Sequence, residues 1–271
     1  MLLRKAPVRL KTPDEIKKMR TSGRMVAEIL AMLREAVRPG VSTADLDAIA
    51  EREIRRRGAA PAFKGYGTPP FPGSICVAIN EQVVHGIPSA RRLVEGDVLS
   101  LDMGAKLDGF FGDCAVTLPV GRVSPAAGSL LRVTEEALFH GIDVVRPGAR
   151  VSDIGAAVQQ HVEAHGFTVV REFVGHGIGT ALHEEPQIAN YGPSGRGPRL
   201  SEGMVLAIEP MVNAGAAAVK VLADGWTAVT RDGSLSAHFE HTVVVTREGC
   251  EILTLLDADA ARARELMAIS H

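Results

Sequence analysis

The chain has 271 residues, of which 46 % are hydrophobic, and its net charge is −2 with a pI near 6.5. This length supports a large hydrophobic core, and the lack of a basic excess argues against a DNA-binding or other nucleic-acid-binding protein. No run of about 18 apolar residues occurs, and the basic N-terminus lacks the apolar stretch of a signal peptide, so we expect no membrane association. Three cysteines without a paired spacing predict free thiols and a cytoplasmic location.

An internal repeat organises the chain. Residues 37–58 (VRPGVSTADLDAIAEREIRRRG) match residues 145–166 (VRPGARVSDIGAAVQQHVEAHG) without a gap, at an offset of 108. Each copy predicts a helix, a Pro-Gly turn and a second helix, and the first helices are expected at about 13–37 and 126–145. The second helices have predicted N-caps and C-terminal glycine stops, which are Ser42 and Gly58 in one copy and Ser152 and Gly166 in the other.

A second internal match involves acidic residues. LVEGDVLSLDMG (93–104) is similar to LSEGMVLAIEPM (200–211), which aligns Asp102 with Glu209. More weakly, FFGDCAVTLPV (110–120) is similar to HFEHTVVVT (238–246), which aligns Asp113 with Glu240. These matches predict a duplicated α/β unit with a site on a pseudo-twofold axis.

The strand-like segments predict where the acidic side chains point. In VLSLDMGA, Ser100 and Asp102 share one face, whereas Leu99, Leu101 and Met103 share the other, which is expected to pack under the helices. The glycines between Asp102 and Asp113 predict a hairpin that brings the two acids together, with Asp108 at its tip.

Several histidines lie near glycines. His176 lies in FVGHGIGTALHEEP, where three flanking glycines allow a close backbone approach to a ligand, and His183 follows seven residues later. His85 follows a strand-like segment in VVHGIP. The other histidines are not predicted ligands: His238 and His241 flank Glu240, and the rest look like helix-face or terminal residues, namely His140, His161, His165 and His271.

Four buried carboxylates would repel each other unless cations neutralise them. Carboxylates and one imidazole suit two divalent metal ions, with manganese, iron, cobalt and zinc all compatible with these ligand types. Paired metals roughly 3.5–4 Å apart are a hydrolytic arrangement. No HExxH, GxSxG or phosphate-binding loop occurs in the chain. The sequence therefore predicts a dinuclear metal site formed by Asp102, Asp113, His176, Glu209 and Glu240.

With these residues, the chain resembles the type I methionine aminopeptidases over about residues 12–256. The resemblance depends on five segments that occur in the order and spacing of the family: SICVAINEQVVHGIP, GDVLSLDMGAKLDGFFGDCAVTLPVG, FVGHGIGTALHEEPQIANYG, GMVLAIEPM and DGWTAVTRDGSLSAHFEHTVVVT. It implies the duplicated pita-bread α/β fold, with helices outside a curved antiparallel sheet. The implied organisation is an N-terminal extension (1–11), a single catalytic domain (12–257) and a C-terminal tail (258–271). The catalytic domain would consist of two half-repeats, at about 12–120 and 121–257.

The resemblance also implies roles for the site residues. Asp113 and Glu240 would bridge the two metals, Asp102 would complete one metal, and His176 and Glu209 the other. Glu209 would also act as general base and acid, His183 would stabilise the oxyanion, and His85 would contact the peptide. The methionine side chain would enter an apolar pocket formed by Phe71, Cys76, Leu182 and Trp226, with Tyr66 as a further candidate.

The implied activity is removal of the initiator methionine from nascent proteins whose second residue is small and uncharged. The expected partners are nascent polypeptide N-termini near the ribosome exit, and the expected state is a monomer. Two alternatives remain open: an Xaa-Pro aminopeptidase or prolidase of the same fold, and a metal-free binding protein of that fold. The stretch KGYGTPPFPGSIC (64–76) departs from the family's usual GYxGFPxSIC, so the shape of the methionine pocket is the least determined feature.

Overall fold

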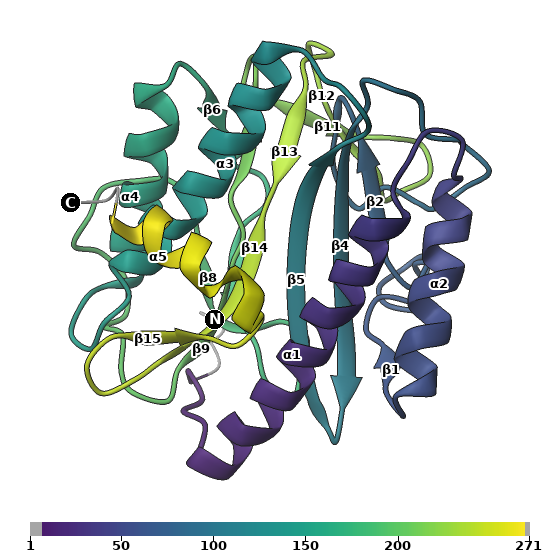
Figure 1. Ribbon diagram of the computed structural model, residues 1–271. Helices are drawn as coiled ribbons and strands as arrows, with labels where there is room; N and C mark the ends of the chain where they lie inside the picture. The colour runs from purple at the N-terminus through teal and green to yellow at the C-terminus, as the bar shows by residue number, and fades with distance from the viewer. Residues whose placement is uncertain (1–6, 269–271) are drawn as a thin grey trace.

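A curved antiparallel sheet forms the centre of the computed structural model, which describes residues 7–268 (Figure 1). Among these residues the sheet has nine strands in the order β1-β4-β5-β14-β9-β7-β8, with β2 beside β4 and β15 beside β14. The strands are β1 (Ala60–Pro61), β2 (Cys76–Ile79), β4 (Val98–Leu107), β5 (Phe110–Pro119), β7 (Gly175–Gly177), β8 (Glu184–Ile188), β9 (Val205–Ile208), β14 (Glu240–Val245) and β15 (Cys250–Ile252). The β4–β5 pair of one half therefore lies directly beside the β14–β9 pair of the other.

Two smaller sheets extend the structure at one end. Within residues 7–268 each has three strands, in the orders β13-β10-β6 and β11-β12-β3. Their strands are β3 (Gln82–Val84), β6 (Thr168–Val169), β10 (Met211–Asn213), β11 (Val219–Val221), β12 (Ala228–Thr230) and β13 (Ser236–His238). They supply the loops that carry His85 and Trp226 to the site described below.

The helices lie on the outside of the sheet (Figure 1). Helix α1 crosses β4 and β5, α3 packs beside α4, and α5 packs against α3. The helical segments are α1 (Pro13–Ala36), α2 (Thr43–Arg56), α3 (Pro125–Asp143), α4 (Val151–Ala164), the 3-10 turn η1 (Asp257–Asp259) and α5 (Ala260–Ala268). The predicted helix pairs and the predicted fold of helices outside an antiparallel sheet are thus confirmed.

The N-terminal ends of the repeated helices α2 and α4 test the two N-caps that the sequence predicts. Ser42 caps α2 as predicted: its hydroxyl accepts from the Asp45 N–H at 3.1 Å, and Asp45 accepts from the Ser42 N–H at 3.0 Å. The prediction for Ser152 is wrong, because α4 begins at Val151 with Arg150 as its N-cap and Ser152 lies inside the helix. Asp153 accepts from the Arg150 N–H at 2.7 Å, so half of the capping box persists without the hydroxyl.

Gly58 and Gly166 follow α2 and α4 in the left-handed conformation, with φ of 76° and 79°. Glycine adopts this region at no steric cost, which explains the predicted stops. The two copies therefore end in the same way although they begin differently.

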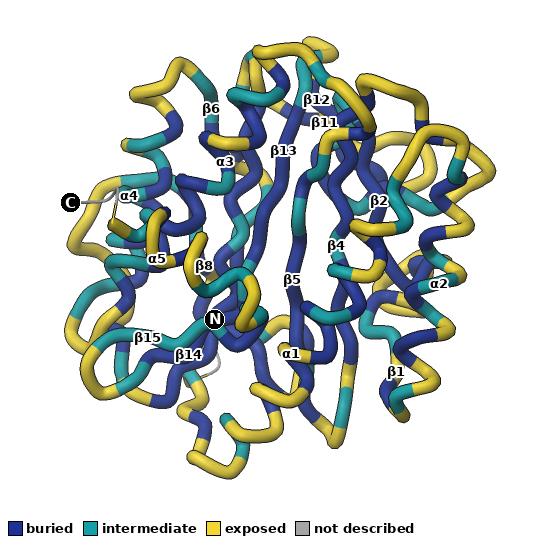
Figure 2. Tube along the Cα trace, in the orientation of Figure 1, coloured by how far each residue is buried: buried dark blue, intermediate teal, exposed yellow. Residues whose placement is uncertain are grey.

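The hydrophobic core lies between the helices and the sheet, where the strands are buried along most of their length (Figure 2). Leu99, Leu101 and Met103 on β4 are fully buried and pack with α1 residues such as Ile29 and Leu33, as the strand alternation predicts. The opposite face of the sheet is therefore the one that presents the acidic residues.

Glycines allow α1 to lie very close to β5. A Cβ atom at Gly112 would lie 2.8 Å from the Gly23 nitrogen and 2.9 Å from its Cα. No side chain fits between the helix and the strand at this point, which directly precedes Asp113.

Both ends of the described chain contact the rest of the molecule. The Lys11 ammonium binds the Glu184 carboxylate at 2.8 Å, and both side chains are largely buried. Ala263 and Leu266 of α5 join the core cluster that includes Leu138 of α3. Within residues 7–268 no helix combines the length and apolarity needed to cross a lipid bilayer, and Cys76, Cys114 and Cys250 are free thiols, as predicted.

Candidate metal centre

Three acidic side chains lie together in the middle of the sheet. Asp102 on β4 lies opposite Ala115 on β5, and Ala115 lies opposite Glu240 on β14. Asp113 precedes Ala115 by two residues and points to the same face, because side chains alternate along a strand. The predicted hairpin turn at Asp108, whose φ is 49°, sets this register. The small Ala115 side chain leaves the space between the carboxylates open.

The second half of the chain adds Glu209 and His176. Strand β9 ends at Ile208, so Glu209 follows it directly, and His176 on β7 lies opposite Ala207 of β9. The His176 Nε2 atom is 3.5 Å from Glu209 Oε1, and its Nδ1 atom donates to the Gly177 carbonyl at 2.9 Å. Because Nδ1 carries the proton in this hydrogen bond, Nε2 presents its lone pair to the carboxylates.

The cluster is electrostatically unfavourable when it contains protein atoms alone. Burial raises the pKa of the Asp113 carboxyl to about 7, and burial together with the neighbouring carboxylates raises the pKa values of Asp102, Glu209 and Glu240 well above their ordinary range. Burial also lowers the pKa of His176 to about 3, so this imidazole is neutral and contributes no compensating charge. A positive charge from outside the polypeptide would relieve this repulsion.

The ligand atoms also fit a metal. Asp102 Oδ1, Asp113 Oδ1 and Glu240 Oε1 are buried without a hydrogen-bond partner. Ligand atoms of Asp113, His176 and Glu240 lie within 4.8 Å of one another, and all three residues are buried. Buried oxygens without partners are costly unless they bind a cation, so this group can hold metal.

A cavity of about 120 Å³ joins the acidic cluster to an apolar end. All the predicted site residues line it, including the further candidate Tyr66, and so does one residue that was not predicted, Phe63. Phe63 was missed because APAFKG carries no motif that separates a pocket phenylalanine from a core one. Trp226 packs edge-on against Phe71 at 5.2 Å between ring centroids. Its Nε1–H donates to the Pro69 carbonyl at 3.0 Å, which ties Trp226 to the unusual proline-rich stretch, whose residues Phe71 and Cys76 also line the cavity.

His183 and His85 lie beside the acidic cluster in this cavity. His183 Nδ1 is 2.7 Å from the Tyr66 hydroxyl, and its ring is 4.2 Å from that of His176. His85 has a φ of 59° and packs edge-on against Trp226, with 6.0 Å between centroids. Burial lowers the pKa of His183 and lowers the pKa of His85 to about 4, so both rings are neutral at pH 7 and each can donate one N–H.

His238, which is not among the predicted ligands, also lies close to the cluster. Its Nε2 atom is buried without a hydrogen-bond partner and lies 4.0 Å from Glu209 Oε2. Burial lowers its pKa to about 3. Its position two residues before Glu240 is the one sequence signal that could have identified it.

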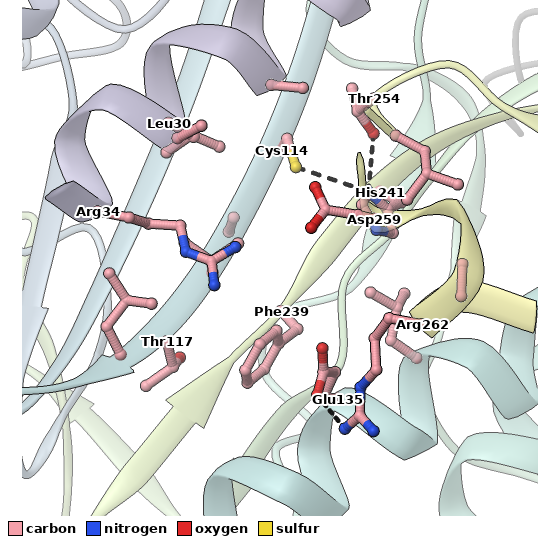
Figure 3. A pocket seen from close by; sticks show the side chains of 18 of the residues that line it. Leu30, Arg34, Cys114, Thr117, Glu135, Phe239, His241, Thr254, Asp259 and Arg262 are labelled. Atoms are coloured by element: carbon pink, nitrogen blue, oxygen red, sulfur yellow. Dashed lines mark hydrogen bonds and ion pairs between the residues drawn. The ribbon is translucent and has the colours of Figure 1, made fainter. Parts of the chain in front are cut away.

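A larger cavity of about 440 Å³ lies on the helix side of the sheet (Figure 3). It contains a cysteine–histidine pair, with Cys114 Sγ 3.6 Å from His241 Nδ1. Burial raises the pKa of the Cys114 thiol, and burial lowers the pKa of His241 to about 4. The thiol therefore stays protonated and the imidazole is a weak base, which is the opposite of a reactive Cys–His pair.

A duplicated antiparallel sheet that brings four carboxylates and a histidine together beside an apolar cavity indicates a metal-dependent hydrolase. The comparisons with known proteins make this class more specific. The chain belongs to metallopeptidase family M24, whose family model matches residues 17–247.

Individual relatives agree with this family. The chain is 56 % identical over 244 residues to methionine aminopeptidase 1 of Bacillus subtilis. The aligned residues cover 90 % of this chain and 98 % of that protein. The crystal structure of methionine aminopeptidase from Thermotoga maritima matches with a TM-score of 0.90 and 46 % identity, over 92 % of this chain and all of the other. These similarities confirm the predicted family and the pita-bread fold.

An Xaa-Pro dipeptidase from Bacillus anthracis is also similar, with a TM-score of 0.74 and 25 % identity. The match covers 91 % of this chain but only 62 % of the dipeptidase. The prolidase alternative therefore shares the fold but has a longer chain and a lower sequence identity.

Proposed function

We propose that this protein removes the N-terminal methionine from nascent proteins whose second residue is small and uncharged. The observation that carries the proposal is the cavity in which the acidic cluster and the apolar residues Phe71, Leu182 and Trp226 meet. A thioether side chain suits such an apolar and aromatic lining. The names of the similar proteins, with identities up to 56 %, support the same activity. Residues 12–257 would form the single catalytic domain.

Two divalent metal ions, chosen from cobalt, manganese, iron and zinc, would bind Asp102, Asp113, His176, Glu209 and Glu240. When bound, the metals polarise the scissile carbonyl and lower the pKa of water. Asp113 and Glu240, on the neighbouring strands β5 and β14, would be the carboxylates shared by the two ions. Asp102, His176 and Glu209 would supply the remaining ligands.

The protein side chains would carry the proton and orient the substrate. Glu209 would accept a proton from the attacking water and pass it to the leaving amine, because its carboxylate lines the cavity beside the acidic cluster. The neutral His183 would donate an N–H to the developing oxyanion, with its other nitrogen held by Tyr66. His85, which lines the same cavity, would donate to the substrate peptide.

The proposal extends to the cellular setting. The substrates would be nascent polypeptide N-termini near the ribosome exit, in the cytoplasm, and the enzyme would act as a monomer. No contact with DNA or a membrane is part of this activity.

The test is a peptide panel with metal analysis. The protein, reconstituted with each of the four ions in turn, should release methionine from Met-Ala-Ser, release little from Met-Trp-Ser, and leave Xaa-Pro peptides intact. His176→Ala should lose metal and activity together, measured by elemental analysis and by methionine release. Preferred cleavage of Xaa-Pro peptides, or full turnover by His176→Ala without metal, would overturn the assignment.

A further inference from the structure

A second group of metal-ligating side chains lies outside the sheet site, between helices α3 and α4. Glu136 and His140 are four residues apart on α3, and His161 on α4 is four residues before His165, the C-cap of that helix. Residues at this spacing share one face of a helix. From the sequence the three histidines look like unrelated helix-face residues; the packing of α3 against α4 brings them together.

The side chains are close enough to act as one group. His161 Nε2 is 3.1 Å from Glu136 Oε2. The His161 ring stacks on His140 at 4.1 Å and lies 4.5 Å from the His165 ring. Ligand atoms of Glu136, His161 and His165 all lie within 4.8 Å of one another. Among the described residues, this group and the one in the sheet are the two that meet this criterion.

The simpler explanation is a hydrogen bond that holds the two helices together. Glu136 and His161 alone would satisfy that role, but a hydrogen bond between the helices does not account for the position of His165. His165 Nδ1 donates to the His161 carbonyl at 2.9 Å, which fixes the lone pair on Nε2 in the way that metal-binding histidines are oriented.

Other features of the group favour a cation. Burial lowers the pKa values of His140 and His161, so both rings are neutral at pH 7. In His161 the Nε2–H donates to Glu136 and Nδ1 keeps the lone pair, and binding an ion through Nε2 would move the proton to Nδ1. Arg132 donates to both oxygens of Glu136 at 2.9 Å, but a carboxylate has about four lone-pair positions and can also bind a metal. His165 caps the C-terminal end of α4, where the helix dipole favours positive charge.

We propose that Glu136, His161 and His165 form a binding site for a divalent cation of the zinc class between helices α3 and α4. One carboxylate and two imidazoles suit zinc, whose ligands lie about 2.0–2.2 Å from the ion. Closing the group around an ion requires a small inward movement, which the exposed His165 side chain can make. The ion would link the two helices and stabilise the second half of the fold.

The test compares zinc binding by three forms of the full chain: the parent protein, His165→Gln, and the control Glu163→Gln. Glu163 is exposed on the same helix, accepts from Gln159 at 2.7 Å and is not part of the group. Equilibrium dialysis followed by elemental analysis should show about one zinc ion fewer per chain in His165→Gln. The control should equal the parent. Added zinc should raise Tm more in the parent and the control than in His165→Gln.

All three forms have the same sheet site, so the difference in zinc content between them does not depend on what the sheet site binds. His165 is exposed and takes no part in the proposed peptidase chemistry, so methionine release should be unchanged. His161→Gln, which removes a second ligand, should reproduce the loss of zinc. Equal zinc content in the parent and His165→Gln would overturn the proposal and leave the hydrogen-bond explanation.

Discussion

Replacing Asp113 by asparagine should stabilise the metal-free protein and destabilise the metal-loaded one. The Asp113 carboxyl is buried, its Oδ1 atom has no hydrogen-bond partner, and burial raises its pKa from 3.8 to about 7. Asparagine has nearly the same shape and no charge. Without metal the substitution therefore removes an unfavourable charge, whereas with metal it removes a ligand.

The expected change in the free energy of unfolding follows from the pKa of the Asp113 carboxyl. At pH 8, above both pKa values, the difference between 3.8 and about 7 corresponds to a penalty of about 4 kcal/mol for the ionised carboxylate. Burying the amide without a full set of partners costs about 1–3 kcal/mol, which leaves a net gain of about 1–3 kcal/mol. Below pH 3.8 the acid is protonated in both states, so its penalty begins as the pH rises through 3.8 and is complete above about 7. The gain should therefore vanish as the pH falls toward 4.

Urea unfolding of chelator-treated protein at several pH values measures this effect. The matched control is Asp97→Asn, because Asp97 is also buried but accepts from Asn80 Nδ2 at 2.9 Å and from the Val94 N–H at 3.0 Å. That substitution should lower the free energy of unfolding with or without metal. If Asp113→Asn also destabilises the metal-free protein at pH 8, the charge in the cluster is already compensated and the argument for a cation fails.

Two further predictions concern the oxyanion and the packing of α1. His183→Ala should retain metal, measured by elemental analysis, and lower kcat by about 100- to 1,000-fold with a smaller effect on KM; loss of metal would instead make His183 a ligand. Gly112→Ala should destabilise the protein by about 1–3 kcal/mol in urea unfolding, because its Cβ would lie 2.8 Å from the Gly23 nitrogen. Gly128→Ala, at a position on α3 with no atom within 4 Å of the added Cβ, should be neutral or stabilising, and equal effects of the two substitutions would contradict the close-packing argument.

Local patterns in the chain were sufficient for several parts of the structure. The capping residue Ser42 and the glycine stops after α2 and α4 follow from short-range hydrogen bonding and backbone conformation. The Asp108 turn and the alternation along β4 place Asp102 and Asp113 on one face of one hairpin. Where the local pattern changed, as at Ser152, the prediction failed because the cap position depends on which residue first adopts helical geometry.

The residue types and their order along the chain determined the internal repeat and the family and predicted the ligand set, since these are properties of the sequence itself. Only the tertiary structure decided which distant residues meet. Phe63 and His238 join the site, and Glu136 and His161 come within 3.1 Å although they are 25 residues apart. The physical reason is that such contacts are set by how helices and strands pack, and packing depends on shape complementarity across the whole core.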